Sequence, residues 1–204
     1  MRYFSFFKRT IRVLVLSALA FALAACNPLE NETLSMSYLV VNSLRGLDES
    51  GAAADYVASD VLFQDPATGD TSIIADTATA TLTARMLDPD PIMGTSPYAD
   101  VQLTGYTVTF TRSDGRNTPG VDVPYPFDGG LTVLLEVDNP TEFSFIIVRE
   151  SAKQEPPLLD ILQAGSQAEI FYTTAQVDFF GHDLTGAQVK VSGSISVRFA
   201  NFAN

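Results

Sequence analysis

Residues 189–199 read VKVSGSISVRF, the clearest alternation of apolar and polar side chains in the chain. The apolar positions are odd-numbered and the polar ones even-numbered: Val189, Val191, Ile195, Val197 and Phe199 against Lys190, Ser192, Ser194, Ser196 and Arg198. Successive side chains of a β-strand point to opposite sides of the sheet, so this pattern predicts a strand with one face in a core. Residues 169–180 alternate similarly, and the turn residues at 181–186 predict that the two strands pair.

Six further strands are predicted from composition and periodicity. They lie at about residues 34–44, 56–64, 78–86, 101–112, 131–137 and 142–149. Periodicity leaves a helix open as the alternative for residues 34–44. In residues 101–112 the apolar positions change from odd to even at Gly105, which predicts a β-bulge there. The short break after residues 131–137 predicts an antiparallel hairpin with residues 142–149.

One short helix is expected at residues 156–162, which read PPLLDIL. Proline suits the first turn of a helix, and Gly165 can close its end. We expect this helix to cross between two sheets. About eight strands, frequent turn residues and one short helix predict an all-β fold, an antiparallel β-sandwich. The chain has no detectable internal repeat, so residues 34–204 are expected to form a single domain.

The end of the chain carries a resemblance to a known fold family. It rests on Phe179, Gly181, Asp183, Gly186, Val189, Val191 and Phe199. These residues resemble the closing hairpin of bacterial immunoglobulin-like domains, which implies an immunoglobulin-like sandwich. The chain lacks the buried Trp and the paired cysteines of antibody domains, since it holds no tryptophan and one cysteine.

The amino-terminal segment reads as an export signal. Residues 13–26 read VLVLSALAFALAAC and follow the basic residues Arg2, Lys8, Arg9 and Arg12. A basic start, an apolar run and small residues at its end are typical of a secretory signal peptide. The apolar run is shorter than the roughly 20 residues that span a bilayer, so a plain transmembrane anchor is not favoured.

The sequence Leu23-Ala24-Ala25-Cys26 resembles the lipobox of bacterial lipoproteins. This resemblance implies removal of a signal peptide at residues 1–25. It also implies a diacylglycerol on the Cys26 thiol and an acyl chain, such as palmitate, on the new amino terminus. Asn27 departs from the Asp that favours inner-membrane retention in Gram-negative relatives, so the resemblance implies the outer membrane. Residues 26–33 read as the lipidated terminus and a short spacer. The alternative is an ordinary secretory signal with an incidental cysteine.

Charge and cysteine content limit the partners. Cleavage before Cys26 leaves eight of the 12 basic residues and all 24 acidic ones, a formal charge of −16. Such a surface repels phosphate backbones, so we expect no nucleic-acid partner. Anionic lipid is repelled too, which leaves the acyl chains as the expected membrane attachment. With its one cysteine lipidated, the chain can form no internal disulfide.

Few residues suit catalysis or metal binding. His182 is the single histidine and falls in the predicted turn, so we expect an exposed turn residue rather than a general base. One histidine and a lipidated cysteine do not make a zinc site. Three acidic pairs lack the spacing of a calcium loop and are expected to be turn formers: Asp65 with Asp70, Asp88 with Asp90, and Asp122 with Asp128. The sequence therefore predicts no catalytic residue, no metal site and no cofactor.

The connection at residues 113–130 is the candidate binding loop. A loop this long is usually functional or holds structure of its own. It displays Tyr125 and Phe127 between prolines, as aromatic contact residues often are; alternatively, both rings pack under the loop as a lid on the core. We predict a non-enzymatic structural or binding module of the cell envelope, with a protein or glycan partner left open. The alternatives are a carbohydrate- or ligand-binding domain that uses this loop and a carboxylate-based hydrolase.

Overall fold

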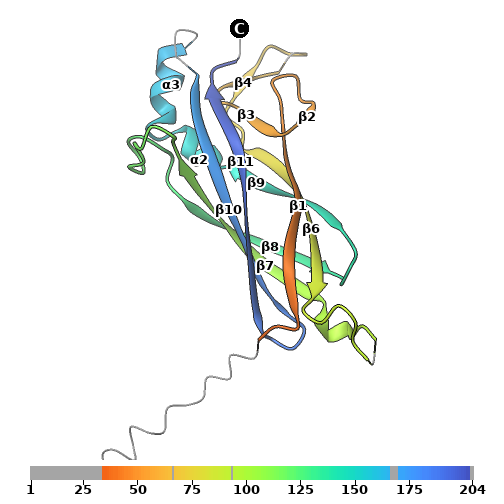
Figure 1. The fold of residues 1–204 in the computed structure, drawn as a ribbon. Coiled ribbons are helices and arrows are strands. Elements are labelled where there is room, and N and C mark those ends of the chain that lie inside the picture. The colour runs from red at the N-terminus through yellow and green to blue at the C-terminus, as the bar shows by residue number, and fades with distance from the viewer. Residues whose placement is uncertain (1–33, 66, 93, 166–169, 203–204) are drawn as a thin grey trace, which may run out of the picture. The chain divides into compact units, whose positions relative to one another are not determined.

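Two β-sheets form the body of the protein (Figure 1), in a computed structural model that describes residues 34–65, 67–92, 94–165 and 170–202. The first sheet has four strands in the order β2-β1-β6-β9. Their bounds are Ala53–Ala54 for β2, Ser37–Leu47 for β1, Asp76–Met86 for β6 and Thr141–Val148 for β9. Every neighbouring pair in this sheet is antiparallel.

The second sheet has five strands in the order β3-β11-β10-β7-β8. Their bounds are Tyr56–Asp60 for β3, Gln188–Ala200 for β11, Phe171–Asp183 for β10, Val101–Thr111 for β7 and Phe127–Leu135 for β8. Strand β3 runs parallel to β11, with Val57 opposite Val197, while the other pairs are antiparallel. The expectation of purely antiparallel sheets is therefore wrong at this edge. Because β3 and β11 lie far apart along the chain, no local sequence pattern indicates that they pair.

The closing hairpin confirms the interpretation of residues 189–199. Strands β10 and β11 pair antiparallel, with Ala175 opposite Ile195 and Phe179 opposite Val191. Val189, Ile195, Val197 and Phe199 are buried, whereas the even-numbered Lys190, Ser194 and Ser196 are exposed. The strand continues to Asp183, however, so the predicted turn at 181–186 is wrong in its first half and His182 lies in β10.

The predicted β-bulge at Gly105 is confirmed. The register of β7 slips between Leu103 and Gly105 against β8, and the register of β10 slips between Phe180 and Gly181 against β7. The slip lets Leu103 and Tyr106 both reach the core although one is odd-numbered and the other even-numbered.

The predicted hairpin between residues 131–137 and 142–149 is wrong. Strand β8 pairs with β7, while β9 pairs with β6 in the other sheet. The intervening chain crosses between the sheets, held by hydrogen bonds from the Asp138 N–H to the Ala84 carbonyl (2.9 Å) and from the Val137 N–H to Asp100 Oδ1 (2.9 Å). A short break is compatible with either connection, so its length alone did not decide between them.

The described residues hold eleven strands and two α-helices, rather than about eight strands and one helix. Two additional strands, β2 and β5 (Thr71–Ser72), are two residues long. The strand predicted at residues 56–64 is divided into β3 and the two-residue β4 (Phe63–Gln64), which pairs with β5. Helix α2 (Glu150–Lys153) precedes α3 (Leu158–Ala164), which begins after the two prolines rather than at Pro156. A 3₁₀-helix spans Pro97–Ala99. Because α2 and α3 connect β9 to β10, the expected crossing between sheets is confirmed.

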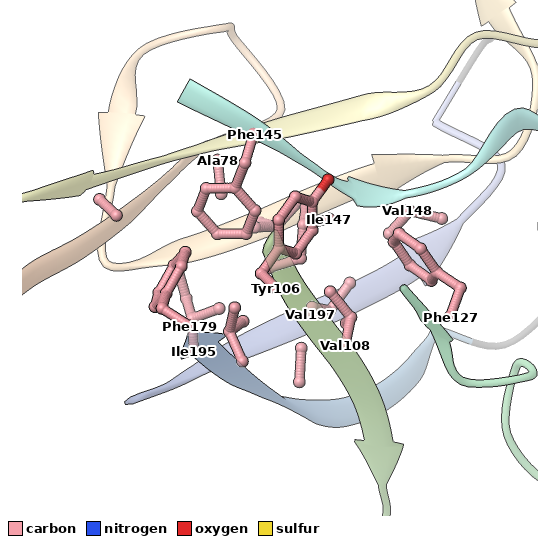
Figure 2. Packing of buried hydrophobic residues seen from close by; sticks show 14 of the residues in the cluster. Ala78, Tyr106, Val108, Phe127, Phe145, Ile147, Val148, Phe179, Ile195 and Val197 are labelled. Atoms are coloured by element: carbon pink, nitrogen blue, oxygen red, sulfur yellow. The ribbon is translucent and has the colours of Figure 1, made fainter. Parts of the chain in front are cut away.

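Aromatic rings from both sheets meet in one core (Figure 2). Phe145 of β9 packs edge-on against Tyr106 of β7, with ring centroids 5.1 Å apart, and against Phe179 of β10 at 5.2 Å. Small side chains on β6, such as Ala78 and Ala80, leave room for these rings. The Tyr106 hydroxyl accepts a hydrogen bond from the Ile146 N–H at 3.1 Å, so its polar end is satisfied.

Candidate functional site

A hollow of about 610 Å³ lies where β1 and β11 end. Its apolar lining comes from Leu47, Phe63, Ile74 and Phe202, and its acidic lining from Asp48, Glu49, Asp60 and Asp76. Leu47 ends β1 and Phe202 follows β11, so the hollow lies at the end of the domain opposite Leu34 (Figure 1). Apolar walls with a few polar groups are typical of ligand sites.

One rim of the hollow is the turn that joins β1 to β2. Asp48 Oδ1 accepts hydrogen bonds from the Ser50 hydroxyl (2.6 Å), the Ser50 N–H (2.9 Å) and the Ala52 N–H (2.9 Å). The Ser50 hydroxyl, followed by these N–H groups, lowers the pKa of Asp48 below its ordinary value. Asp48 therefore holds the turn and stays ionised on the rim.

Asp60 and Asp76 form the floor of the hollow, and a buried ion pair supports it. Lys153, at the end of α2, is fully buried, and its ammonium donates to Asp76 Oδ1 at 2.9 Å and to the Asp60 carbonyl at 2.6 Å. Asp76 Oδ2 accepts from the Ser59 hydroxyl at 2.5 Å. Burial raises the pKa of Asp76, against the opposite effects of Lys153 and Ser59.

The two carboxylates at this floor are engaged within the protein. Both oxygens of Asp76 accept hydrogen bonds, and Asp60 Oδ1 accepts from the Leu62 N–H at 3.2 Å and the Phe202 N–H at 3.1 Å. Burial raises the pKa of Asp60. General acid–base catalysis needs a carboxylate oxygen that faces the substrate. These hydrogen bonds instead join β3, β6, α2 and the segment after β11, so the arrangement suits a structural role better than a catalytic pair.

Sequence reasoning missed this cluster. Asp76 and Lys153 are 77 positions apart, and Lys153 is followed by the polar residues Gln154 and Glu155. No local pattern distinguishes such a lysine from an exposed one.

The structure separates the two aromatic residues of the candidate loop. Phe127 begins β8 and is 7% exposed, with its ring 6.3 Å from that of Tyr106 and 4.6 Å from the Arg149 guanidinium. Tyr125 is 49% exposed, and its ring lies against Gly120 so closely that a Cβ there would overlap it. Phe127 therefore closes the core, and Tyr125 alone presents an aromatic surface.

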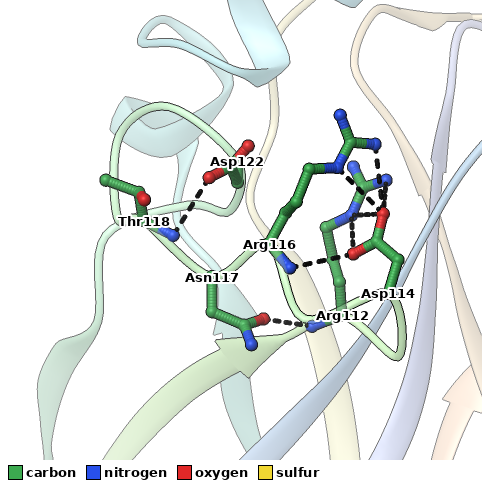
Figure 3. A network of polar contacts seen from close by, with 6 residues as sticks. All are labelled: Arg112, Asp114, Arg116, Asn117, Thr118 and Asp122. Carbon is green, nitrogen blue, oxygen red and sulfur yellow. Dashed lines mark hydrogen bonds and ion pairs between the residues drawn. The ribbon is translucent and has the colours of Figure 1, made fainter.

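The tip of this loop is held by its own polar contacts (Figure 3). Asp114 accepts from Arg112 Nη2 at 2.6 Å and from Arg116 Nε at 3.0 Å, and Asn117 Oδ1 accepts from the Arg112 N–H at 2.6 Å. Arg112 above all, then Arg116, holds the pKa of Asp114 well below its usual range. One carboxylate thus offsets part of the charge of two arginines, and the loop conformation is stabilised locally.

Three of the acidic residues expected in turns each stabilise one, whereas Asp128 lies in β8 and accepts a hydrogen bond from the Thr107 hydroxyl at 2.6 Å, so the expectation is wrong for Asp128. Asp65 Oδ1 accepts from the Ala67 N–H at 2.8 Å, Asp88 Oδ1 from the Asp90 N–H at 3.1 Å, and Asp122 Oδ2 from the Thr118 N–H at 3.2 Å. Within the described ranges, no group of three or more His, Cys, Asp or Glu side chains could hold a metal ion.

The lipidation candidate Cys26, the signal peptide at 1–25 and the spacer up to residue 33 lie outside the described residues. In the part of the chain that the structure does describe, no helix combines the length and apolar character needed to cross a membrane.

Comparison with known proteins gives no relative: no protein-family model, curated protein or solved structure matches the chain.

Proposed function

We propose that the chain is a lipid-anchored protein of the bacterial cell envelope whose β-domain acts as a non-enzymatic structural or binding module. The observation that carries the proposal is the position of its single cysteine: Cys26 directly follows an apolar run that ends in Leu23-Ala24-Ala25. This is the place where a lipobox requires its cysteine. Two or three acyl chains there are sufficient for stable anchoring.

The outer membrane is the proposed location because Asn27 stands where Asp would favour the inner membrane. We also propose that the domain is an immunoglobulin-like sandwich. Two observations support this: both sheets contribute to one core, and the chain ends in the long β10–β11 hairpin.

Lipid analysis of the full chain tests the anchor. The wild-type protein, expressed in a Gram-negative host, is expected to incorporate labelled palmitate, to carry the mass of acylated Cys26 and to fractionate with the outer membrane. Cys26→Ser is expected to lose the label and to leave the membrane fraction. Ser113→Cys in the Cys26→Ser background is the control, since Ser113 is exposed in the domain and the change restores a thiol away from the lipobox. Unchanged membrane association of Cys26→Ser would contradict the proposal.

A second candidate function, ligand binding, is favoured by the hollow of about 610 Å³ opposite Leu34. Its acidic rim and apolar walls suit a cationic ligand with an apolar part. Screens of cationic peptides and of glycans should be run on the wild type, on Ile74→Arg, which places a cation in the hollow, and on Tyr125→Ala. Binding lost only in Ile74→Arg assigns the hollow. Loss only in Tyr125→Ala assigns the loop, and no binding in either screen removes this candidate.

A further inference from the structure

Exposed apolar side chains gather where the described chain begins. They are Leu34, Leu87, Ile92, Tyr98 and Leu184, and each is at least 45% exposed. They come from the start of the domain, the β6–β7 connection and the β10–β11 turn, which lie together at the lower end of Figure 1. We call these five residues the apolar end.

Hydrogen bonds fix the segments that carry the apolar end. The Leu87 N–H donates to the Met36 carbonyl at 2.9 Å, which ties the end of β6 to the start of the domain. The Leu184 N–H donates to the Tyr98 carbonyl (3.2 Å) and the Asp100 carbonyl (3.0 Å). Three segments distant in sequence therefore form one surface.

The buried carboxylate of Asp183 completes this frame. It accepts from the Ser35 hydroxyl at 2.8 Å and the Met36 N–H at 3.1 Å, while the Ser37 hydroxyl donates to the Ala99 carbonyl at 2.5 Å. The residues next to Leu34 are thus bonded to both other segments. The position of Leu34 fixes the end of the domain at which any amino-terminal tether is attached.

Chain length limits how far this end can be from a lipid on Cys26. Leu34 is eight residues beyond Cys26. Eight extended residues span at most about 29 Å, at roughly 3.6 Å per residue. The opposite end is farther away: Tyr172 is eleven positions before Asp183 along β10, a distance of about 36 Å at roughly 3.3 Å per residue.

We propose that the apolar end docks on the bilayer surface, with its aliphatic side chains in the boundary between headgroups and acyl chains. This inference rests on the proposed lipid anchor, which confines the apolar end near the membrane. Leucine and isoleucine side chains favour that boundary, and tyrosine, with an apolar ring and a polar hydroxyl, is enriched there.

The charge of this end selects the kind of lipid surface. Asp88 and Asp90 are exposed in the same connection that carries Leu87 and Ile92. Their carboxylates repel anionic headgroups, so we expect contact with a surface rich in zwitterionic phosphatidylethanolamine. The lipid anchor supplies the attachment, and docking orients the domain with its hollow directed away from the membrane.

Two tyrosines of nearly equal exposure provide a matched test. The chain contains no tryptophan, so Tyr98→Trp and Tyr172→Trp each introduce a single fluorophore. Tyr98 is 62% exposed at the apolar end, and Tyr172 is 60% exposed at the opposite end. The full-length lipidated variants are reconstituted in phosphatidylethanolamine-rich vesicles that contain brominated lipid. Docking predicts a blue-shifted emission and severalfold stronger quenching for Tyr98→Trp. Equal quenching of the two variants would overturn the proposal.

The same samples separate failure of docking from failure of the anchor. Mass analysis and flotation report whether the protein is acylated and bound to vesicles. A protein without acyl chains overturns the anchor and the docking together. An acylated, floating protein with equal quenching overturns docking alone. A blue shift of Tyr98→Trp without bromine quenching means that protein covers this end, and it also overturns docking.

A third variant tests the aliphatic side chains. Leu87→Ser with Ile92→Ser, added to Tyr98→Trp, alters two exposed side chains and is expected to leave folding and flotation unchanged. Quenching of the fluorophore is expected to fall toward the level of Tyr172→Trp. Quenching that stays at the level of Tyr98→Trp alone would overturn the role assigned to the aliphatic side chains.

Discussion

The carboxylate of Asp183 accepts a hydrogen bond from the Ser35 hydroxyl at 2.8 Å, across 148 positions of sequence. The same side chain holds the β10–β11 turn, because its Oδ1 accepts from the Thr185 hydroxyl (2.5 Å) and the Ala187 N–H (3.0 Å). One buried carboxylate therefore joins the start of the domain to its closing hairpin. The sequence places Asp183 in the turn of the closing hairpin but does not indicate its bond to Ser35, since a partner 148 positions away leaves no local signal.

Asp183→Asn should destabilise the domain most at neutral pH. Burial alone would raise the pKa of Asp183, but the hydrogen bonds from Thr185, Ser35, Ala187 and Met36 outweigh it and lower the pKa to about 2, from an ordinary value of 3.8. A depressed folded-state pKa stabilises the protein above pH 4, and this stabilisation is lost as the pH falls toward 2. A pKa shift of this size corresponds to roughly 2 kcal/mol of unfolding free energy at neutral pH.

Urea unfolding between pH 7 and pH 2 measures this effect. The gap in unfolding free energy between wild type and Asp183→Asn should narrow as the pH falls below 4. Asp90→Asn, at an exposed turn position, is the control and should change stability little at any pH. A gap that is independent of pH would contradict the assignment.

Lys153→Met should cost far more stability than Lys190→Met. The ion pairs have similar lengths, 2.9 Å for Lys153 with Asp76 and 2.8 Å for Lys190 with Asp178. The Lys153 side chain is fully buried, whereas that of Lys190 is 60% exposed. Removing one partner of a buried pair leaves an uncompensated charge and costs about 3–5 kcal/mol, while an exposed pair contributes about 0–1 kcal/mol.

Chemical denaturation of the two variants at pH 7 checks this difference. Adding Asp76→Asn to Lys153→Met should recover part of the loss, because it removes the charge left at the floor of the hollow. Equal costs for Lys153→Met and Lys190→Met would show that the buried pair does not stabilise the floor.

Gly181→Ala should destabilise the sheet at the β7 bulge, whereas Gly130→Ala should not. A Cβ at Gly181 would collide with the backbone of Gln102 and come within 2.8 Å of Leu103 Cα, and backbone atoms cannot rotate away. A Cβ at Gly130, in strand β8 on the other side of β7, has open space around it. We expect a cost of about 1–3 kcal/mol at Gly181, typical of overpacking, and little change at Gly130. Thermal melts of both variants test this, and equal melting temperatures would contradict the close packing of β7 on β10.

Local pattern explains which parts of the fold were predictable. The sequence predicts β11 because the inward side chains of residues 189–199 are apolar and the outward ones are polar. It predicts the bulge at Gly105 because the apolar positions of β7 change there from odd to even. The two-residue strands β2, β4 and β5 are too short to have a period. The parallel pairing of β3 with β11 and the Lys153–Asp76 pair depend on contacts between distant segments, which periodicity does not encode. In the candidate loop, the spacing of the prolines singles out Tyr125 and Phe127 but does not encode which of the two rings is buried.

Val197→Asp should unfold the domain, whereas Ser196→Asp should leave it folded. The two residues are neighbours on β11, but Val197 is fully buried and Ser196 is exposed on the opposite face. Burial of a large apolar side chain contributes on the order of 1.5–3 kcal/mol, and replacement by a carboxylate adds the cost of an unpaired buried charge. Together these terms are comparable with the 5–15 kcal/mol of net stability that is typical of a domain.

Residues 27–204 of each variant, produced without the lipid, should differ clearly in solubility, and Ser196→Asp should give the β-type circular dichroism and cooperative melt expected of the wild type. Similar melting temperatures for the two variants would contradict the inward facing of Val197 and, with it, the packing of the two sheets around one core.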